Sequence, residues 1–140
     1  MTRMLDRFYP TTLALLRIAT GVMFWQHGAQ KLFGLLGGNP REFLTLLWFA
    51  GVFEFAGGIL IVAGLFTRPV AFILAGEMAV AYFTSHFPRE FWWPIQNAGE
   101  FAVLYCFIYL FLFIAGPGRW SLDGLLRKKP ARDEAVPPSS

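Results

Sequence analysis

The sequence predicts an all-α fold, a four-helix transmembrane bundle with both termini in the cytoplasm. Three observations support this. The 140-residue chain is 56% hydrophobic and only 15% charged, whereas soluble domains carry about 25% charged residues. Its apolar residues form four runs, each near the ~20 residues that cross a bilayer. Most of its basic residues fall on one side of such a bundle.

Helix breakers set the limits of the four spans. The expected spans cover residues 11–33, 43–66, 69–85 and 96–115. Pro10 stands at the first turn of the first span, where a helix tolerates proline. The segment 37–40, Gly-Gly-Asn-Pro, separates the first two spans, and 116–118, Gly-Pro-Gly, ends the fourth. The loop 86–94 contains paired tryptophans and charges, which is typical of a segment at the lipid headgroups.

The distribution of basic residues predicts the orientation. Lys31, Arg41 and Arg89 fall on one side of the bundle. The other side carries the larger set: Arg3, Arg7, Arg68, Arg119, Arg127, Lys128, Lys129 and Arg132. The positive-inside rule places that larger set in the cytoplasm. We therefore expect a cytoplasmic N-terminus over residues 1–10, a membrane domain over 11–123 and a basic, disordered cytoplasmic tail over 124–140.

Composition also excludes several classes of function. The net charge of +3 comes from residues at span ends and in the tail, which indicates contact with lipid headgroups and not with nucleic acid. Cys106 is the single cysteine, so the chain forms no internal disulfide, dithiol relay or cysteine-based metal site. We find no nucleotide-binding loop, no Ser/His/Asp set and no metal-ligand motif.

Ionisable residues inside the apolar runs are the main functional signal. A charge in hydrocarbon costs several kcal/mol unless it is paired or faces water, so such residues cluster where a membrane protein works. His27 and Lys31 lie one helical turn apart, roughly 6 Å along the axis. We predict an outward-facing polar cavity lined by His27, Lys31, Glu54, Glu77 and Glu100. Arg17, Gln30 and His86 are further candidates, and no catalytic residue is assigned.

These residues allow more than one interpretation. Glu54 and Glu77 either form a proton path or bind a quinone ring, with His27 and Lys31 as hydrogen-bond donors, or they pair with Arg17 and Lys31 and fix helix register. Lys31 and Arg17 also have the length to reach the headgroups. The two histidines alone are slight evidence for axial haem ligation, so haem is disfavoured.

Several motifs taken together resemble the DoxX family of small bacterial membrane proteins. They are 17–21 (RIATG), 27–32 (HGAQKL), 54–58 (EFAGG), 64–68 (GLFTR), 77–81 (EMAVA) followed by His86, and 116–123 (GPGRWSLD). The resemblance implies a four-helix protein of the bacterial inner membrane. The family takes its name from a subunit of an archaeal quinone-linked oxidase complex that handles thiosulfate. The resemblance identifies no catalytic residue.

The leading functional hypothesis is a membrane subunit of a redox system, which interacts with quinone or with a partner oxidoreductase. Any redox chemistry then comes from a bound cofactor or from the partner. A non-enzymatic scaffold or assembly factor for another membrane protein is the first alternative. A small proton-linked transporter is the second, and its size favours a homo-oligomer in that case.

Overall fold

The computed structural model describes residues 5–89 and 92–127. Its elements are α2 (Tyr9–Phe33), α3 (Leu46–Ala63), α4 (Thr67–Ala81), the π-helical turn η1 (Tyr82–His86), α5 (Glu100–Ala115) and α6 (Leu122–Arg127). The all-α prediction with four main helices is confirmed, and the helix limits lie within a few residues of the expected spans. Helix α6 covers the first residues of the expected tail, while 128–140 and 1–4 lie outside the described residues.

Local sequence explains where the helices begin and end. Pro10 lies in the first turn of α2, as expected. The hydroxyl of Thr45 caps α3 by accepting a hydrogen bond from the amide of Trp48 at 3.2 Å. Gly64 ends α3 with a left-handed backbone, φ 67°. Glycine adopts that conformation without steric cost, so the chain can turn directly into α4.

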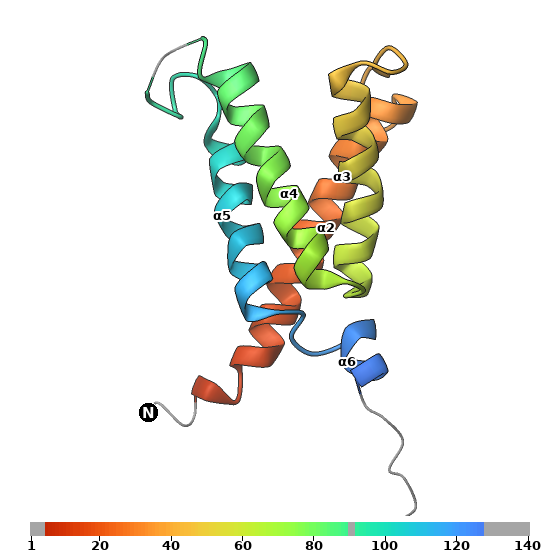
Figure 1. The fold of residues 1–140 in the computed structure, drawn as a ribbon, viewed down its shortest axis with the longest axis vertical. Helices are drawn as coiled ribbons and strands as arrows, with labels where there is room; N and C mark the ends of the chain where they lie inside the picture. The colour runs from red at the N-terminus through yellow and green to blue at the C-terminus, as the bar shows by residue number, and fades with distance from the viewer. Residues whose placement is uncertain (1–4, 90–91, 128–140) are drawn as a thin grey trace, which may run out of the picture.

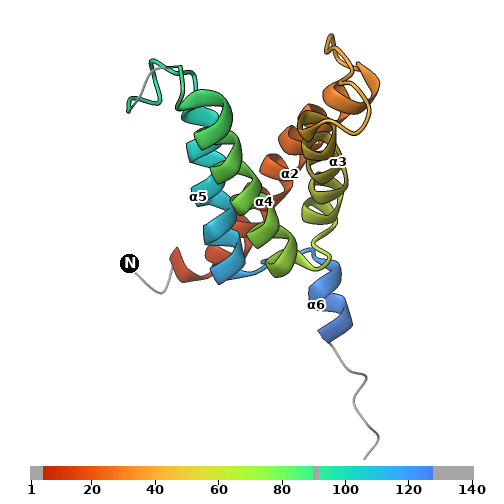
Figure 2. The same cartoon turned by 45° about the horizontal axis from the view of Figure 1, so that its top comes forward.

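The helices form two hairpins that diverge toward one end of the molecule. Helices α2 and α3 pair along their length, and α4 pairs with α5 (Figures 1 and 2). The loop 34–45 and the segments 87–89 and 92–99 lie at the splayed end. The α3–α4 turn and α6 lie at the other end, where the hairpins approach each other. The two hairpins are therefore furthest apart at the end that the charge distribution predicts to be outward.

The α2–α3 pair is held at very short range by glycine. A Cβ on Gly28 would meet the backbone nitrogen of Phe55, and one on Gly58 would lie 2.6 Å from the backbone nitrogen of Trp25. Each glycine thus faces the backbone of the other helix. Small residues allow this approach, which maximises contact between helices in a membrane.

Aromatic packing joins the two hairpins at their centre. Phe24 of α2 lies 5.3 Å from Tyr105 and 5.0 Å from Tyr109 of α5, measured between ring centroids. The hydroxyl of Tyr109 donates to the carbonyl of Thr20 at 3.3 Å. Edge-to-face ring pairs of this kind add about 0.5–1.5 kcal/mol beyond the area they bury. These contacts fix α5 against α2 where the two hairpins meet.

The outer surface of the helices is apolar. Large hydrophobic side chains are exposed on each main helix, among them Leu15, Phe53, Ile59, Phe72, Phe107 and Ile114. Among the described helices, Leu46–Ala63 passes both the length and the hydropathy criteria for a span, and the apolar Glu100–Ala115 is slightly shorter. The four-span topology and its orientation remain predictions from the sequence.

Arg17 is a structural residue at the closed end of the bundle. Its side chain is fully buried, and it neither pairs with a carboxylate nor extends to the surface. All of its bonds go to carbonyl oxygens. Nε donates to Pro117, Nη1 to Ile61 and Val62, and Nη2 to Arg119 and Trp120, over 2.5–3.3 Å. A guanidinium has five N–H donors, so every donor is used. Arg17 therefore ties the segment after α5 to the end of α3 and does not belong to the cavity.

Asp123 of α6 fixes the start of α4. Its carboxylate accepts hydrogen bonds from the amides of Phe66 at 2.8 Å and Thr67 at 2.9 Å. Its own amide donates to the carbonyl of Gly64 at 2.9 Å. Partial burial opposes ionisation, but the hydrogen bonds from Thr67 and Phe66 outweigh it and lower the pKa of Asp123. Asp123 therefore caps the neighbouring helix α4 from within α6.

We expect Asp123→Ala to destabilise the fold by about 1 kcal/mol at neutral pH, the usual cost of losing a helix cap. Because its pKa is lower in the folded state, Asp123 stabilises the protein above the unfolded pKa of about 3.9. That contribution disappears as the pH falls through the folded pKa. Thermal unfolding in detergent between pH 7 and pH 3 should therefore show a smaller acid-dependent drop for the variant. Asp6→Ala, at an exposed site, is the control. Equal drops in all three proteins would contradict this role.

Candidate functional site

An ion pair between α2 and α3 forms the base of the site. Lys31 Nζ lies 2.5 Å from Glu54 Oε1. The side chain of Glu54 is 4% exposed and that of Lys31 is 24% exposed. Gly51 lies beside the stem of Lys31, where a Cβ would come within 2.9 Å of it. The close glycine packing of the two helices thus brings the lysine and the glutamate together.

Glu77 of α4 adds a second carboxylate to this pair. Both of its carboxylate oxygens are buried and have no hydrogen-bond partner, and the same is true of Oε2 of Glu54. Glu77 lies within electrostatic range of Glu54 and Lys31, and Glu54 lies within that range of His27. The site therefore contains two carboxyl groups around one ammonium group. Buried polar groups without partners are rare and require an explanation.

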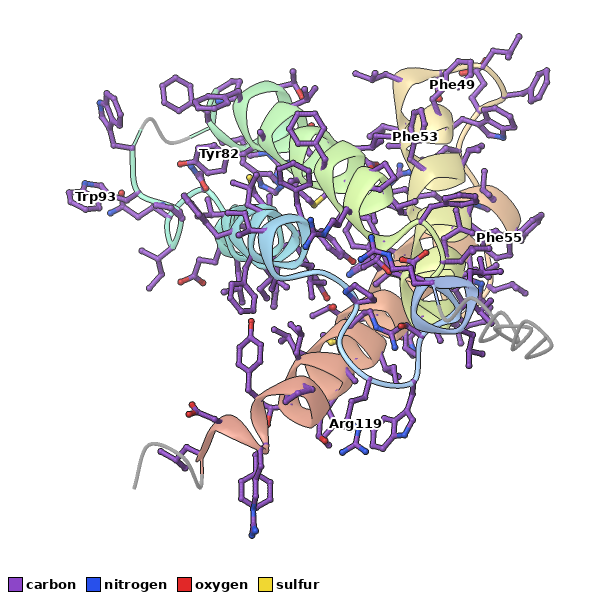
Figure 3. The ribbon with its side chains drawn as sticks, turned by 60° about the horizontal axis from the view of Figure 1, so that its bottom comes forward. Phe49, Phe53, Phe55, Tyr82, Trp93 and Arg119 are labelled. Atoms are coloured by element: carbon purple, nitrogen blue, oxygen red, sulfur yellow. The ribbon has the colours of Figure 1, made fainter. Side chains whose placement is uncertain are left out.

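A cavity of about 270 Å³ opens between α3 and α4 beside these carboxyl groups. Its polar wall contains Lys31, Glu54 and Glu77. Its apolar wall is built from Leu46, Leu47, Phe49, Ala50, Phe53, Ile73 and Val80. In Figure 3, Phe53 lies on the side of α3 toward α4, whereas Phe55 lies on the far side, where it packs against Trp25. Pockets with a mainly apolar wall and a few convergent polar groups are typical small-molecule sites.

A second cavity of about 140 Å³ adjoins the first and shares Lys31, Glu54, Met78 and Ala81 with it. Its other lining residues are Phe24, His27, His86, Phe101, Ala102 and Tyr105. The hydroxyl of Tyr105 is buried and has no hydrogen-bond partner. Both histidines of the chain thus lie around the same space as the Lys31–Glu54 pair.

The turn η1 orients His86 toward this second cavity. Its Nδ1 lies 3.1 Å from the carbonyl oxygen of Asn97, which assigns the proton of a neutral ring to Nδ1 and leaves Nε2 as an acceptor. Asn97 is buried, and its side-chain oxygen accepts from the amide of Gly99 at 2.8 Å. Short π-helical insertions occur often at functional sites.

The structure brings together five of the predicted site residues: His27, Lys31, Glu54, Glu77 and His86. It does not place the other three at the cavities. Arg17 binds carbonyls at the opposite end. Gln30 donates to the carbonyl of Leu36 at 3.2 Å and packs on the loop after α2. Glu100 lies exposed in the first turn of α5, a position that suits a carboxylate because of the helix dipole.

Tyr105 is the residue that the sequence analysis missed. It belongs to the buried face of α5 with Ala102, Tyr109 and Leu112. That spacing is visible in the sequence, but a tyrosine in an apolar run is also typical of a core residue.

Within the described part of the chain, no three His, Cys, Asp or Glu side chains gather as metal ligands would.

The chain matches one known family of proteins. The model of the DoxX family matches residues 12–87, which is more than half of the chain. This chain belongs to the DoxX family. The match runs from α2 through η1 and therefore includes Lys31, Glu54, Glu77 and His86 but ends before Tyr105.

Curated relatives extend this result along the chain. A Haemophilus influenzae protein described as uncharacterized is 41% identical over 131 residues, with 89% of this chain and 98% of that protein covered. The inner membrane protein YphA of Escherichia coli is 32% identical, with 81% and 89% covered. An uncharacterized membrane protein of Mycobacterium tuberculosis is 28% identical, with 91% and 88% covered. No solved structure matches the chain. This DoxX-family chain is a protein of the inner membrane.

Proposed function

We propose that this protein is a membrane subunit of a redox system and binds the ring of a quinone in the cleft between its two hairpins. In this proposal both termini lie in the cytoplasm and the splayed end faces outward. The described chain has a single cysteine and no dithiol of its own. A partner oxidoreductase therefore supplies or accepts the electrons.

One observation carries this proposal. Four polar side-chain atoms without partners, from Glu54, Glu77 and Tyr105, belong to residues that line two adjoining cavities. A buried polar group without a hydrogen bond costs about 1–3 kcal/mol. A ligand of the quinone class removes this cost in the state in which its ring oxygens carry protons, and its apolar ring fills the space beside Phe49 and Phe53.

The remaining groups suit the same ligand. Lys31 uses one N–H on Glu54 and has two further donors for ring oxygens. His27 and His86 line the same space, and their ring nitrogens can donate or accept hydrogen bonds. The apolar wall on α3 and α4 suits a quinone tail that enters from the lipid. These groups come from helices of both hairpins, so the site forms only when the hairpins assemble.

A proton-linked transporter is the second candidate, and the excess of carboxyl groups over ammonium groups favours it. Two carboxyl groups around one lysine in an apolar cleft provide a place for one extra proton or for a cationic solute. In that case proteoliposomes should show solute-dependent proton uptake that Glu77→Gln abolishes. Uptake that is insensitive to this substitution excludes the transporter.

We expect His27→Ala and Glu54→Gln each to weaken quinone binding about tenfold or more. The first removes a polar group from the cavity wall, and the second releases Lys31 from the ion pair that holds its donors there. Binding is measured by calorimetric titration of the protein in lipid nanodiscs with a short-chain benzoquinone. Glu100→Gln makes the same chemical change outside both cavities and should leave binding unchanged. Thermal unfolding of each variant reports whether the bundle remains folded. Unchanged affinity in both cavity variants would overturn the site.

A further inference from the structure

The groups around the cleft contain more hydrogen-bond acceptors than donors. Oε2 of Glu54 and both oxygens of Glu77 are buried without partners. The Glu54 side chain is 96% buried, since 4% of it is exposed, and its residue lines both cavities. Tyr105, 5% exposed, adds a hydroxyl, which is both donor and acceptor and so leaves the balance unchanged. Three carboxylate oxygens therefore lack donors.

Protonation of one carboxyl group does not remove this need for donors. One proton on either carboxyl group would turn one of the three oxygens into a donor and leave two acceptors. The two remaining N–H groups of Lys31 do not distinguish between ligands, because hydroxyl and carbonyl oxygens both accept from them. The discriminating feature of the cleft is thus its need for a ligand that donates.

Resting on the proposed function, we infer that the cleft binds the reduced form of its ligand, the quinol, in preference to the quinone. The two hydroxyl groups of a quinol donate to Glu54 and Glu77 and still accept from Lys31 and Tyr105. A quinone carries carbonyl oxygens, which only accept. It therefore leaves the carboxylate oxygens unpaired.

Glu77→Gln is the variant that isolates this preference. The carboxyl group of Glu77 makes no hydrogen bond within the described protein, so the substitution removes no native hydrogen bond and keeps the side-chain volume. It replaces one acceptor oxygen with an NH₂ donor. Binding of the quinone should therefore improve while binding of the quinol weakens, and the ratio of the two affinities should fall toward one.

The test compares a short-chain benzoquinone with its quinol in anaerobic calorimetric titrations of the full chain in nanodiscs. We expect the quinol to bind about tenfold tighter, the usual effect of pairing a buried acceptor. The midpoint potential of the bound couple should then lie about 30 mV above that of the free couple, since tenfold equals about 30 mV for two electrons. Glu100→Gln should retain the wild-type ratio.

The possible outcomes separate this inference from the proposed function. If neither form binds, the proposed function fails, and the inference fails with it. If both forms bind with equal affinity, or the quinone binds more tightly, quinone-class binding stands and the preference is overturned. If the quinol binds more tightly but Glu77→Gln keeps the wild-type ratio, Glu77 is not the acceptor and the assignment is overturned.

Discussion

Arg17→Met is expected to lower the free energy of unfolding by about 3–5 kcal/mol, the cost of removing one side of a fully buried polar network. Arg17 occupies every donor of its guanidinium with carbonyls from the end of α3 and from residues 117–120. Methionine fills most of the same volume but donates nothing. The carbonyls of Ile61, Val62 and Pro117 would remain buried without the donor that they use in the native fold.

Arg17→Lys should fall between the wild type and the methionine variant. An ammonium group keeps the charge but has three donors on a single nitrogen and cannot reproduce the planar fork. Unfolding is measured by titration with sodium dodecyl sulfate in mixed micelles, followed by circular dichroism. Arg68→Met, at an exposed position in the first turn of α4, is the matched control and should change little. A methionine variant as stable as the control would show that the hydrogen bonds of Arg17 contribute nothing to the stability of the fold.

How much of the site the sequence predicts depends on how each residue obtains its partner. Lys31 and Glu54 are predictable because helical periodicity places each on an inward face, and the close α2–α3 packing follows from the glycines. Arg17 also lies on an inward face, but its partners are backbone carbonyls. Every residue carries a carbonyl, so no sequence pattern marks those partners.

The position of Glu100 was predicted wrongly because the sequence does not show where its helix begins. The apolar run suggests that the fourth span begins near Gln96, which would place Glu100 one turn inside the bundle. The turn around Asn97 and Gly99 instead delays α5 until Glu100 itself. The carboxylate therefore stays exposed in the first helical turn. The error arises from a side-chain hydrogen bond of Asn97, which hydrophobic periodicity does not report.

For Tyr105 the sequence predicts burial but not a place at a cavity. Its position on the buried face of α5 follows from periodicity, but its importance depends on which helix lies opposite. The divergence of the hairpins in Figure 2 leaves its hydroxyl beside a cavity instead of against a carbonyl, as happens to Tyr109 one turn later. The angle between two hairpins is a property of the whole packing, which no single segment encodes.

Gly28→Ala is expected to destabilise the fold by about 3 kcal/mol and to weaken ligand binding at the same time. A methyl group at this position would meet the backbone nitrogen and Cα of Phe55. Backbone atoms in the middle of a helix cannot rotate away, so α2 and α3 must separate. Overpacking of a close contact usually costs about 1–3 kcal/mol. We expect the top of that range because the methyl group would meet backbone atoms, which cannot move aside as a flexible side chain can.

Gly76→Ala is the matched control for this change. Gly76 lies within α4, and a Cβ there would meet no atom within 4 Å. Alanine is the better helix former by about 1 kcal/mol, so this variant should be as stable as the wild type or more stable. Both proteins are compared by the same detergent titration. Equal stability of the two alanine variants would contradict the close approach of α2 and α3.

Gly28→Ala should also change the binding site, because Gly28 lies close to the Lys31–Glu54 ion pair. Lys31 follows Gly28 by about one helical turn, and Glu54 directly precedes Phe55, so separation of the two helices lengthens the ion pair between Lys31 and Glu54. A lysine released from Glu54 no longer holds a donor over the cavity, and quinone and quinol should both bind more weakly. Gly28→Ala protein that is destabilised yet binds both forms with wild-type affinity would show that the cavity groups tolerate helix separation, and it would remove the Lys31–Glu54 pair from the site.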